Sequence, residues 1–423
     1  FVPPGPSGAP TRGMAHILPT GRNFYSVDPQ TIPTLAAWDV GVKLANNLLE
    51  RYLKEENCYP KNVGIVMFGT GTMRTKGDDL AEILYLMGVK PIWNKENGYI
   101  KGLELITLEE LQRPRIDVTI RISGFLRDSF PNIIKLLDEA VQMTAFLDEP
   151  LECNYIEKHV KKEIEELVSH GKKINDAKEE ACYRIFGCKP GTYGAGVNNL
   201  INSQKWSDLK DLANTFISWG GYVYGAKNYG KTSPEIFKRR LSVLDAAVKN
   251  IDNRERGMLD SDDFYSFHGG MIAAVKTYKG KAPKAFIGDS SEPERIKTRT
   301  VTEETRHEFR ARILNPQWIE SMKKHGYKGA GDISQTVNYA FGWDATSDAM
   351  DEWMYKDLTK KFVLDKQFTE WAKEVNPWAL QNITERLLEA IQRGMWNADE
   401  ETKQKITQVY LEVEGDIEGY EDH

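Results

Sequence analysis

The sequence lacks several features that would place a protein in a familiar class. Its 423 residues include only four cysteines, a number typical of a reducing compartment and not of a disulfide scaffold. No apolar run approaches the roughly 20 residues that cross a bilayer, so no transmembrane helix is expected. The net charge of −6 argues against nucleic-acid binding, which normally requires a basic surface. We therefore expect a cytoplasmic protein with no nucleic-acid partner.

The start of the chain is unusual as well. It has no initiator Met, no basic stretch and no apolar core of a signal peptide, and these absences lead us to expect a fragment of a longer, unexported protein. Residues 1–33 hold seven prolines among glycines, which predicts an extended, irregular lead-in.

A nucleotide-binding loop is also missing. Residues 69–75 follow a predicted strand and precede a predicted helix, a position in which anions often bind. The segment lacks the Gly-Lys-Ser/Thr ending of a P-loop and the third glycine of the dinucleotide fingerprint. A structural turn explains it better, and any ATP hydrolysis is expected on a partner protein.

An α/β pattern follows the lead-in. Short apolar runs over 62–68, 89–93 and 117–122 predict strands, and apolar residues at helical spacing predict helices over 34–54 and 131–146. Strands that alternate with helices favour a parallel sheet covered by helices. The predicted fold class is α/β, with a parallel-sheet region followed by a mainly helical C-terminal region.

The expected domain organisation has three parts. The lead-in over 1–33 precedes an α/β domain over 34–150 and a mixed, mainly helical domain over 151–423 with loops rich in glycine and aromatic residues. In those loops, around Tyr193, glycines let backbone approach a flat ligand and aromatic rings offer stacking faces. The alternative is a set of turns packed by aromatic side chains.

His268 is the most distinctive titratable residue. It precedes Gly269 and Gly270 and follows a run of aromatic residues that includes Phe264, Tyr265 and Phe267. An imidazole with this backbone freedom and these rings around it favours a shaped pocket, and imidazole titrates near neutral pH.

A second candidate is the charged helix that contains Glu303, Glu304, His307 and Glu308. Glu303 and His307 are four residues apart, as are Glu304 and Glu308, so each pair shares a helical face. Carboxylate with imidazole suits first-row divalent metals, cobalt included, without selecting among them. The segment is not a zincin motif, because Ala311 stands where the second histidine should be. A solvated charged face is the alternative.

Long phrases of the sequence resemble the CobN and magnesium-chelatase H family, and the likeness covers roughly residues 1–400. They include Leu18-Pro-Thr-Gly-Arg-Asn-Phe-Tyr-Ser26, Thr72-Met-Arg-Thr-Lys-Gly-Asp-Asp79, Phe186-Gly-Cys-Lys-Pro-Gly-Thr-Tyr-Gly-Ala-Gly196, Phe267-His-Gly-Gly-Met271 and Leu314-Asn-Pro-Gln-Trp318. The Pro-rich opening and the pair His268-Gly-Gly-Met-Ile-Ala-Ala274 and Gly288-Asp-Ser-Ser-Glu-Pro293 resemble the cobalt branch more than the magnesium branch. The chain is similar to the C-terminal part of the family's large subunit.

The resemblance implies a metal chelatase, a ligase that forms nitrogen–metal bonds. It implies insertion of Co²⁺, the substrate metal, into the tetrapyrrole hydrogenobyrinic acid a,c-diamide, with ATP and Mg²⁺ on AAA+ ATPase partner subunits. We expect His268, Glu304, His307 and Glu308 to be catalytic, and His268, Glu303 and His307 to bind metal. Since guanidinium binds carboxylate bidentately, we expect the acidic groups of the ring to meet Arg22, Arg74, Arg121 and Arg127, with Tyr193 beside them. For each arginine an ordinary ion pair is the alternative.

Two other functions compete with this interpretation. One is a magnesium chelatase H-type subunit that inserts Mg²⁺ into protoporphyrin IX. The other is a porphyrinoid-binding module with no insertion activity of its own. A stand-alone metallohydrolase would need a compact ligand set, which the sequence does not contain.

Overall fold

The computed structural model describes residues 15–18 and 27–421 of the chain. The chain divides into two compact units. Unit 1 consists of Phe1–Glu255 and Ser266–Thr300, and unit 2 consists of Arg256–Tyr265 and Val301–His423.

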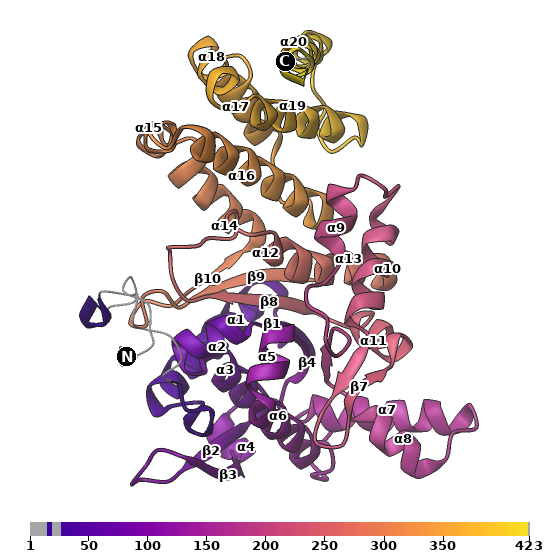
Figure 1. The fold of residues 1–423 in the computed structure, drawn as a ribbon. Coiled ribbons are helices and arrows are strands. Elements are labelled where there is room, and N and C mark those ends of the chain that lie inside the picture. The colour runs from indigo at the N-terminus through magenta and orange to yellow at the C-terminus, as the bar shows by residue number, and fades with distance from the viewer. Residues whose placement is uncertain (1–14, 19–26, 422–423) are drawn as a thin grey trace. The chain divides into compact units, whose positions relative to one another are not determined.

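Unit 1 is built on a mixed sheet of eight strands in the order β10-β9-β8-β1-β4-β5-β6-β7 (Figure 1). Strands β9, β8, β1, β4 and β5 are parallel to their neighbours in that series, while β10, β6 and β7 pair antiparallel. The strands are β1 Asn62–Met67, β4 Asp117–Ile122, β5 Ile185–Gly187, β6 Tyr222–Tyr224, β7 Tyr229–Thr232, β8 Ala246–Ile251, β9 Lys284–Asp289 and β10 Lys297–Thr300.

Helices cover both faces of this sheet. Gly64 on β1 faces Met271 of α13, so a Cβ there would meet the Met271 sulfur at 2.6 Å. Gly288 on β9 has the opposite parity in the register and faces Leu44 of α1. The face of Gly288 carries α1 Leu35–Glu56, α3 Asp78–Met87 and α6 Pro131–Thr144, and the face of Gly64 carries α10 Leu209–Gly220, α11 Pro234–Leu241 and α13 Gly270–Lys279. Because both faces are covered, β1 and β4 are buried at every residue, as expected for parallel strands.

The amino edge of the sheet holds a buried ion network around Asp117, the first residue of β4. Its carboxylate accepts hydrogen bonds from Arg184 Nε at 2.7 Å and Arg240 Nη2 at 2.8 Å. His159 Nδ1, on α7 Tyr155–Ser169, lies 2.8 Å from the same carboxylate. Burial opposes the charge on Asp117, but Arg184 and Arg240 hold the pKa of that carboxyl well below its usual range. Asp117 therefore stabilises the charges of Arg184 and Arg240, although the two arginines repel each other and the pKa of Arg240 is lowered by burial and by Arg184.

One of the three predicted strands lies outside the parallel sheet. β2 Val89–Trp93 pairs antiparallel with β3 Ile100–Leu105 in a separate hairpin, so the prediction that residues 89–93 join the parallel sheet was wrong. Its burial alternates, with Pro91 buried and Ile92 exposed, which is typical of a hairpin at a surface. The predicted turn over residues 69–75 is the short helix α2 Gly69–Thr75.

The remaining helices of unit 1 are short and connect these elements. They are α4 Leu108–Leu111, α5 Gly124–Ser129, α8 Ile174–Ala181 and α9 Val197–Asn202, together with the 3-10 turns Ala15–Ile17 and Pro29–Thr31.

The described part of unit 2 contains helices and connecting loops but no strands. It consists of α12 Asp262–Phe264, α14 Val301–Glu308, the π-helical turn η6 Phe309–Ile313, α15 Pro316–Lys323, α16 Gly326–Ser347, α17 Glu352–Phe362, α18 Lys366–Val375, α19 Pro377–Gln392 and α20 Glu400–Glu421. Trp343 and Trp396 are buried in its core, and Trp343 Nε1 donates to the Met258 carbonyl at 2.9 Å. Among the described residues, no helix is long and apolar enough to span a bilayer.

The α/β fold class is confirmed, and so is the helical C-terminal region. The sequence analysis missed the strands between residues 246 and 300, where β8, β9 and β10 complete the sheet of unit 1.

Candidate functional site

The carboxyl edge of the unit 1 sheet is the natural place for a site. From β1 the chain builds β4 and β5 on one side and then returns to add β8 and β9 on the other side. Ligands of open α/β sheets bind at the carboxyl ends of the strands where the strand order reverses in this way. In this protein that point lies between β1 and β8.

The register places two buried cations in one row on the α13 face of this edge. Val66 of β1 is opposite Arg121 of β4 and opposite Lys249 of β8, so all three side chains point to the same side. Arg121 is fully buried, and burial lowers its pKa to about 10. Lys249 is 3% exposed, burial also lowers its pKa, and its Nζ donates to the Asn250 carbonyl at 2.7 Å.

Aromatic rings separate these two cations. The Arg121 guanidinium lies 4.8 Å from the ring centroid of Phe267, and the Lys249 ammonium lies 4.5 Å from that of Phe68. Phe68 and Phe267 meet edge to face at 5.1 Å. Cation–π contacts of this kind partly replace the water that buried cations lose.

His268 lies in the π-helical turn η5 Tyr265–Gly269, directly after Phe267, and is wholly buried. Burial, reinforced by the positive charge of Lys249, lowers the pKa of His268 to about 3, although the backbone of Phe286 favours the charged form. At neutral pH the imidazole is therefore neutral. Single π-helical turns are frequent at functional sites.

The opposite face of the same edge carries three buried carboxyl groups on α3. We call Asp78, Asp79 and Glu82 the α3 carboxylate cluster; their exposed fractions are 1%, 6% and 1%. Asn250, which follows Lys249 and so points to the other face of β8, donates through Nδ2 to Asp79 at 2.9 Å and to Glu82. Burial and the nearby charge of Asp79 raise the pKa of Glu82 to about 8, against the hydrogen bond from Asn250.

Arg74, on α2, lies at the carboxyl edge of the sheet near this cluster. Its Nε and Nη2 donate to the two carboxylate oxygens of Asp252 at 2.7 and 2.8 Å. Asp252 follows β8, so the bidentate pair joins α2 to the strand at the point where the strand order reverses. The predicted guanidinium for the ring is thus present at the edge, but it is engaged with a carboxylate of the chain itself.

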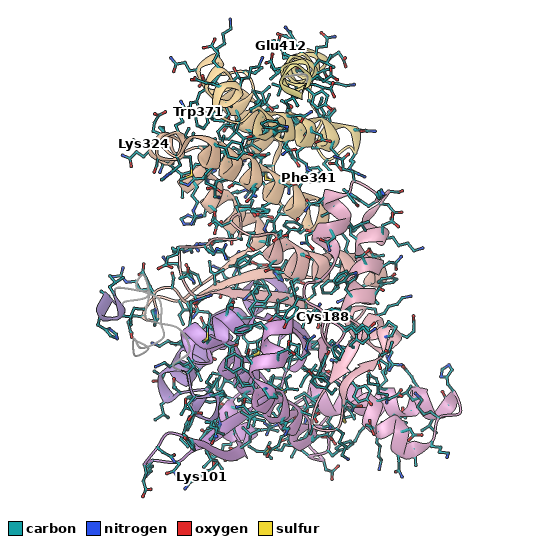
Figure 2. All side chains as sticks on the ribbon, in the orientation of Figure 1. Lys101, Cys188, Lys324, Phe341, Trp371 and Glu412 are labelled. Carbon is teal, nitrogen blue, oxygen red and sulfur yellow. The ribbon has the colours of Figure 1, made fainter. Side chains whose placement is uncertain are left out.

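Arg127 and Tyr193 form the far corner of the edge, near β4 and β5. Arg127 is buried and donates to both oxygens of Asp128, which raises its pKa, and also to the carbonyls of Lys189 and Thr192. Its Nη1 also lies 3.3 Å from the carbonyl of Cys188, a residue labelled in Figure 2. Tyr193 is 61% exposed, and its hydroxyl donates to Asp128 at 2.7 Å. Of the predicted ring contacts in the described residues, Tyr193 offers the most open surface.

The predicted charged helix with the pairs Glu303/His307 and Glu304/Glu308 is α14 of unit 2, and its two faces differ. Glu304 and Glu308 are buried, whereas Glu303 is half-buried and His307 exposed. The Glu308 carboxylate accepts the backbone N–H groups of Met258 and Leu259 at 2.9 and 3.0 Å.

The structure thus gathers Arg74, Arg121, Arg127, Tyr193 and His268 around one sheet edge in unit 1, and places Glu303, Glu304, His307 and Glu308 in unit 2. Arg22 lies outside the described residues. Within residues 15–18 and 27–421, no three His, Cys, Asp or Glu side chains converge as a metal-binding group.

The sequence analysis missed Glu82, Lys249, Asn250 and Asp252. One signal could have found three of them: Lys249, Asn250 and Asp252 are polar residues at and just after the carboxyl end of an apolar run, where a parallel strand delivers side chains to a site. Glu82 has no such signal, because it occupies an ordinary helical position.

The chain is similar to known proteins over nearly its whole length. The family model described as CobN/Magnesium Chelatase matches residues 1–403. The chain is 45% identical to the aerobic cobaltochelatase subunit CobN of Pseudomonas aeruginosa over 98% of its length, and 35% identical to the magnesium-chelatase H subunit of Chlorobaculum parvum over 100%. It is also similar to a solved structure, the catalytic subunit of cobaltochelatase from Mycobacterium tuberculosis, with 48% identity, a TM-score of 0.94 and 98% of the chain covered. The chain spans 33%, 33% and 35% of these three proteins.

Proposed function

Because the chain belongs to the CobN/magnesium chelatase family, we propose that it is part of the large subunit of an ATP-dependent cobalt chelatase. The reaction is the insertion of Co²⁺ into hydrogenobyrinic acid a,c-diamide, a step of cobalamin biosynthesis. The observation that carries the choice of metal is the difference in similarity: 45% and 48% identity to the cobalt proteins against 35% to the magnesium protein.

In this proposal the chain contributes to holding the ring and the metal, and AAA+ ATPase partners in the cytoplasm hydrolyse ATP with Mg²⁺. Insertion requires that water leave the ion, that the pyrrolic protons be removed and that the ring be held in place. The carboxyl edge of unit 1 combines buried cations, a buried imidazole and carboxyl groups, so it can serve these needs.

We assign His268 to the metal. A neutral imidazole keeps the lone pair that binds a divalent ion, and a pKa of about 3 makes it a weak proton acceptor. Since the side chain is wholly buried, contact with Co²⁺ requires the turn η5 to open.

We assign the acidic groups of the ring to Arg22, Arg74, Arg121, Arg127 and Tyr193. Arg74 would exchange Asp252 for a ring carboxylate, which the same bidentate geometry accommodates. Tyr193 needs no rearrangement, because its ring is already exposed. On α14 we assign Glu303 and His307 to metal delivery and Glu304 and Glu308 to proton uptake.

Insertion assays with Co²⁺ and Mg²⁺ test the proposal. The full-length protein that contains this chain is combined with its ATPase partners, and ring spectra follow the reaction. ATP-dependent insertion of Co²⁺ into hydrogenobyrinic acid a,c-diamide is the expected result. Insertion of Mg²⁺ into protoporphyrin IX instead would assign the protein to the magnesium branch, and stoichiometric ring binding without insertion of either metal would make it a carrier.

The first prediction concerns His268. We expect His268→Ala to lower the turnover of the full-length enzyme about 10- to 100-fold, because in this proposal the imidazole contacts the metal. Met271→Ala is the matched control: it truncates a nearby fully buried side chain, so it costs stability but keeps the turnover of the folded enzyme. Wild-type turnover in His268→Ala would remove His268 from the mechanism.

A further inference from the structure

An open cavity of about 580 Å³ lies in unit 1 between α1 and the β2–β3 hairpin. Its lining includes Leu35, Lys76, Trp93 and Lys95. Small-molecule sites run from about 300 to 1,000 Å³ and are mostly apolar with a few placed polar groups. The volume of this cavity falls in that range. Its lining combines the apolar Val27, Leu35 and Trp93 with polar and charged residues, which include Asp28 as well as the two lysines.

The walls of the cavity are fixed to one another. Trp93 Nε1 donates to the Pro33 carbonyl at 2.7 Å, and the Trp93 ring meets Trp38 edge to face at 6.0 Å. Thr34 N–H donates to the Lys76 carbonyl at 3.2 Å. These contacts tie the hairpin, the start of α1 and the end of α2 together, so the cavity exists without a ligand. A preformed site loses little free energy to ordering when it binds.

Backbone conformation fixes the position of Lys76. It ends α2 in the left-handed region at φ 57°, and Gly77 follows at φ 110°. A Cβ on Gly77 would lie 2.8 Å from Ile32 Cγ2, so this turn packs directly on the segment before α1. Lys76 is therefore carried to the rim of the cavity by a turn that cannot easily relax.

Lys76 and Lys95 line this cavity, and together their charges distinguish it from the neighbouring cleft. Neither Lys76 nor Lys95 forms an ion pair with any residue in the described part of the chain. By contrast, Lys43, which lines a neighbouring cleft of about 370 Å³, pairs with Glu294, and Arg74 in the same cleft pairs with Asp252. Thr34 and Lys76 line both spaces, so the cleft continues the cavity toward the sheet edge.

We infer that this cavity binds the tetrapyrrole by one edge of its ring. The half-buried indole of Trp93 and the 62% exposed side chain of Leu35 supply an apolar surface for a flat ring. Lys76 and Lys95 then bind carboxylate side groups of the ring by charge-assisted hydrogen bonds. A flat anionic ligand matches both features, whereas a simple anion would leave the indole unused. The inference rests on the proposed function and adds the surface that receives the ring.

Titration of the 423-residue chain with hydrogenobyrinic acid a,c-diamide, followed by quenching of tryptophan fluorescence, tests the cavity. We expect saturable binding, and a Kd about tenfold or more higher in the double variant Lys76→Ala and Lys95→Ala. The charge-preserving double variant Lys76→Arg and Lys95→Arg should keep more of the affinity than the double alanine variant, because guanidinium also binds carboxylate. The matched control is Lys101→Ala, an exposed lysine of β3 that does not line the cavity (Figure 2).

Trp93→Phe provides a second readout, because it keeps an aromatic ring in place. It should reduce the extent of quenching, since the indole nearest the ring is gone. An unchanged Kd in the Lys76→Ala and Lys95→Ala variant, or no saturable binding by the unaltered chain, would overturn the inference.

The full-length enzyme separates this inference from the proposed function. In the insertion assay we expect the double alanine variant to raise the KM for the ring and to keep kcat, because the lysines hold the ring's side groups and take no part in the bonds that change. An enzyme with wild-type residues that inserts no Co²⁺ refutes the proposed function, and the titration still decides the cavity. A variant with normal KM in an active enzyme refutes only the cavity.

Discussion

At the amino edge of the unit 1 sheet, Asp117 receives hydrogen bonds from Arg184 and Arg240, and each charge has an opposite charge beside it. At the carboxyl edge, Asn250 donates hydrogen bonds to two carboxyl groups, those of Asp79 and Glu82. The cation nearest in sequence, Lys249, points to the other face of the sheet. Burial by itself raises the pKa of a carboxyl group at either edge, but at the amino edge Arg184 and Arg240 outweigh it. The pKa of Asp117 is lowered and that of Glu82 is raised.

The difference indicates what each edge is for. Opposite charges at hydrogen-bonding distance fix one arrangement of side chains, as a structural network requires. A carboxyl group with a raised pKa, and a lysine and a histidine with lowered ones, are costly to bury, and such groups concentrate at functional sites. We therefore expect the amino edge to stabilise the fold and the carboxyl edge, despite its Arg74–Asp252 pair, to carry the groups that act in function.

The largest effect should come from breaking the amino edge. Asp117→Asn keeps the volume of the side chain but leaves Arg184 and Arg240 buried without their main counter-charge. We expect a loss of about 3–5 kcal/mol in the free energy of unfolding, measured with urea. Glu104→Gln, in the exposed pair with Lys90, is the control and should cost about 1 kcal/mol or less. A loss in Asp117→Asn as small as in the control would contradict the structural role of this edge.

An intermediate effect is expected from Glu82→Gln at the carboxyl edge. Glu82 has a pKa of about 8 in the folded chain and 4.5 as its ordinary value. Between these pH values the unfolded chain has lost the proton that the folded chain keeps, so stability falls as pH rises from 4.5 to 8. Glutamine resembles the protonated carboxyl group and has no proton to lose. The variant should gain about 3 kcal/mol relative to wild type at pH 7, and about 1 kcal/mol or less at pH 5.

Urea unfolding at pH 5, 6, 7 and 8 measures this difference. A parallel pH dependence of wild type and Glu82→Gln would mean that Glu82 is ionised in the folded chain, and the contrast between the edges would lose its main support.

The smallest effect is expected from Arg74→Gln. The pair with Asp252 has bidentate geometry, but 34% of the Arg74 side chain is exposed, so solvent screens the interaction. We expect a cost of about 1 kcal/mol in stability, with most of the consequence in ring affinity. A destabilisation as large as that of Asp117→Asn would make this pair another structural network.

Much of the fold could be predicted from the sequence, because its strands and helices follow from hydrophobic patterns over a few neighbouring residues. Strands over 62–68 and 117–122 are continuous apolar runs, and helix α1 has apolar residues at regular spacing. The hairpin strand β2 was assigned to the wrong sheet, since five residues with proline in the middle do not reveal their partner. Strand β8 escaped notice because its partner β1 is more than 180 residues away in sequence.

Site residues could be predicted from the sequence only where the residue type and its neighbours themselves indicate a functional role. A histidine beside two glycines attracts attention, and His268 does lie at the sheet edge. Glu82 looks like any charged helical residue, and only the fold shows that it is 1% exposed beside Asp79. The pairing of Arg74 with Asp252 likewise depends on a contact between residues 178 apart in sequence.

The division of the chain between the units has a consequence for protein engineering. Residues 256–265 belong to unit 2, yet the chain before and after them belongs to unit 1, so the backbone passes between the units three times. Within unit 2, hydrogen bonds anchor residues 256–265, an excursion of the chain from unit 1. The Glu308 carboxylate accepts the N–H groups of Met258 and Leu259, and Trp343 donates to the Met258 carbonyl. A gene split after residue 300 would therefore produce unit 2 without one of its segments. Separate expression of the two units needs the excursion grafted onto the second polypeptide by a new linker.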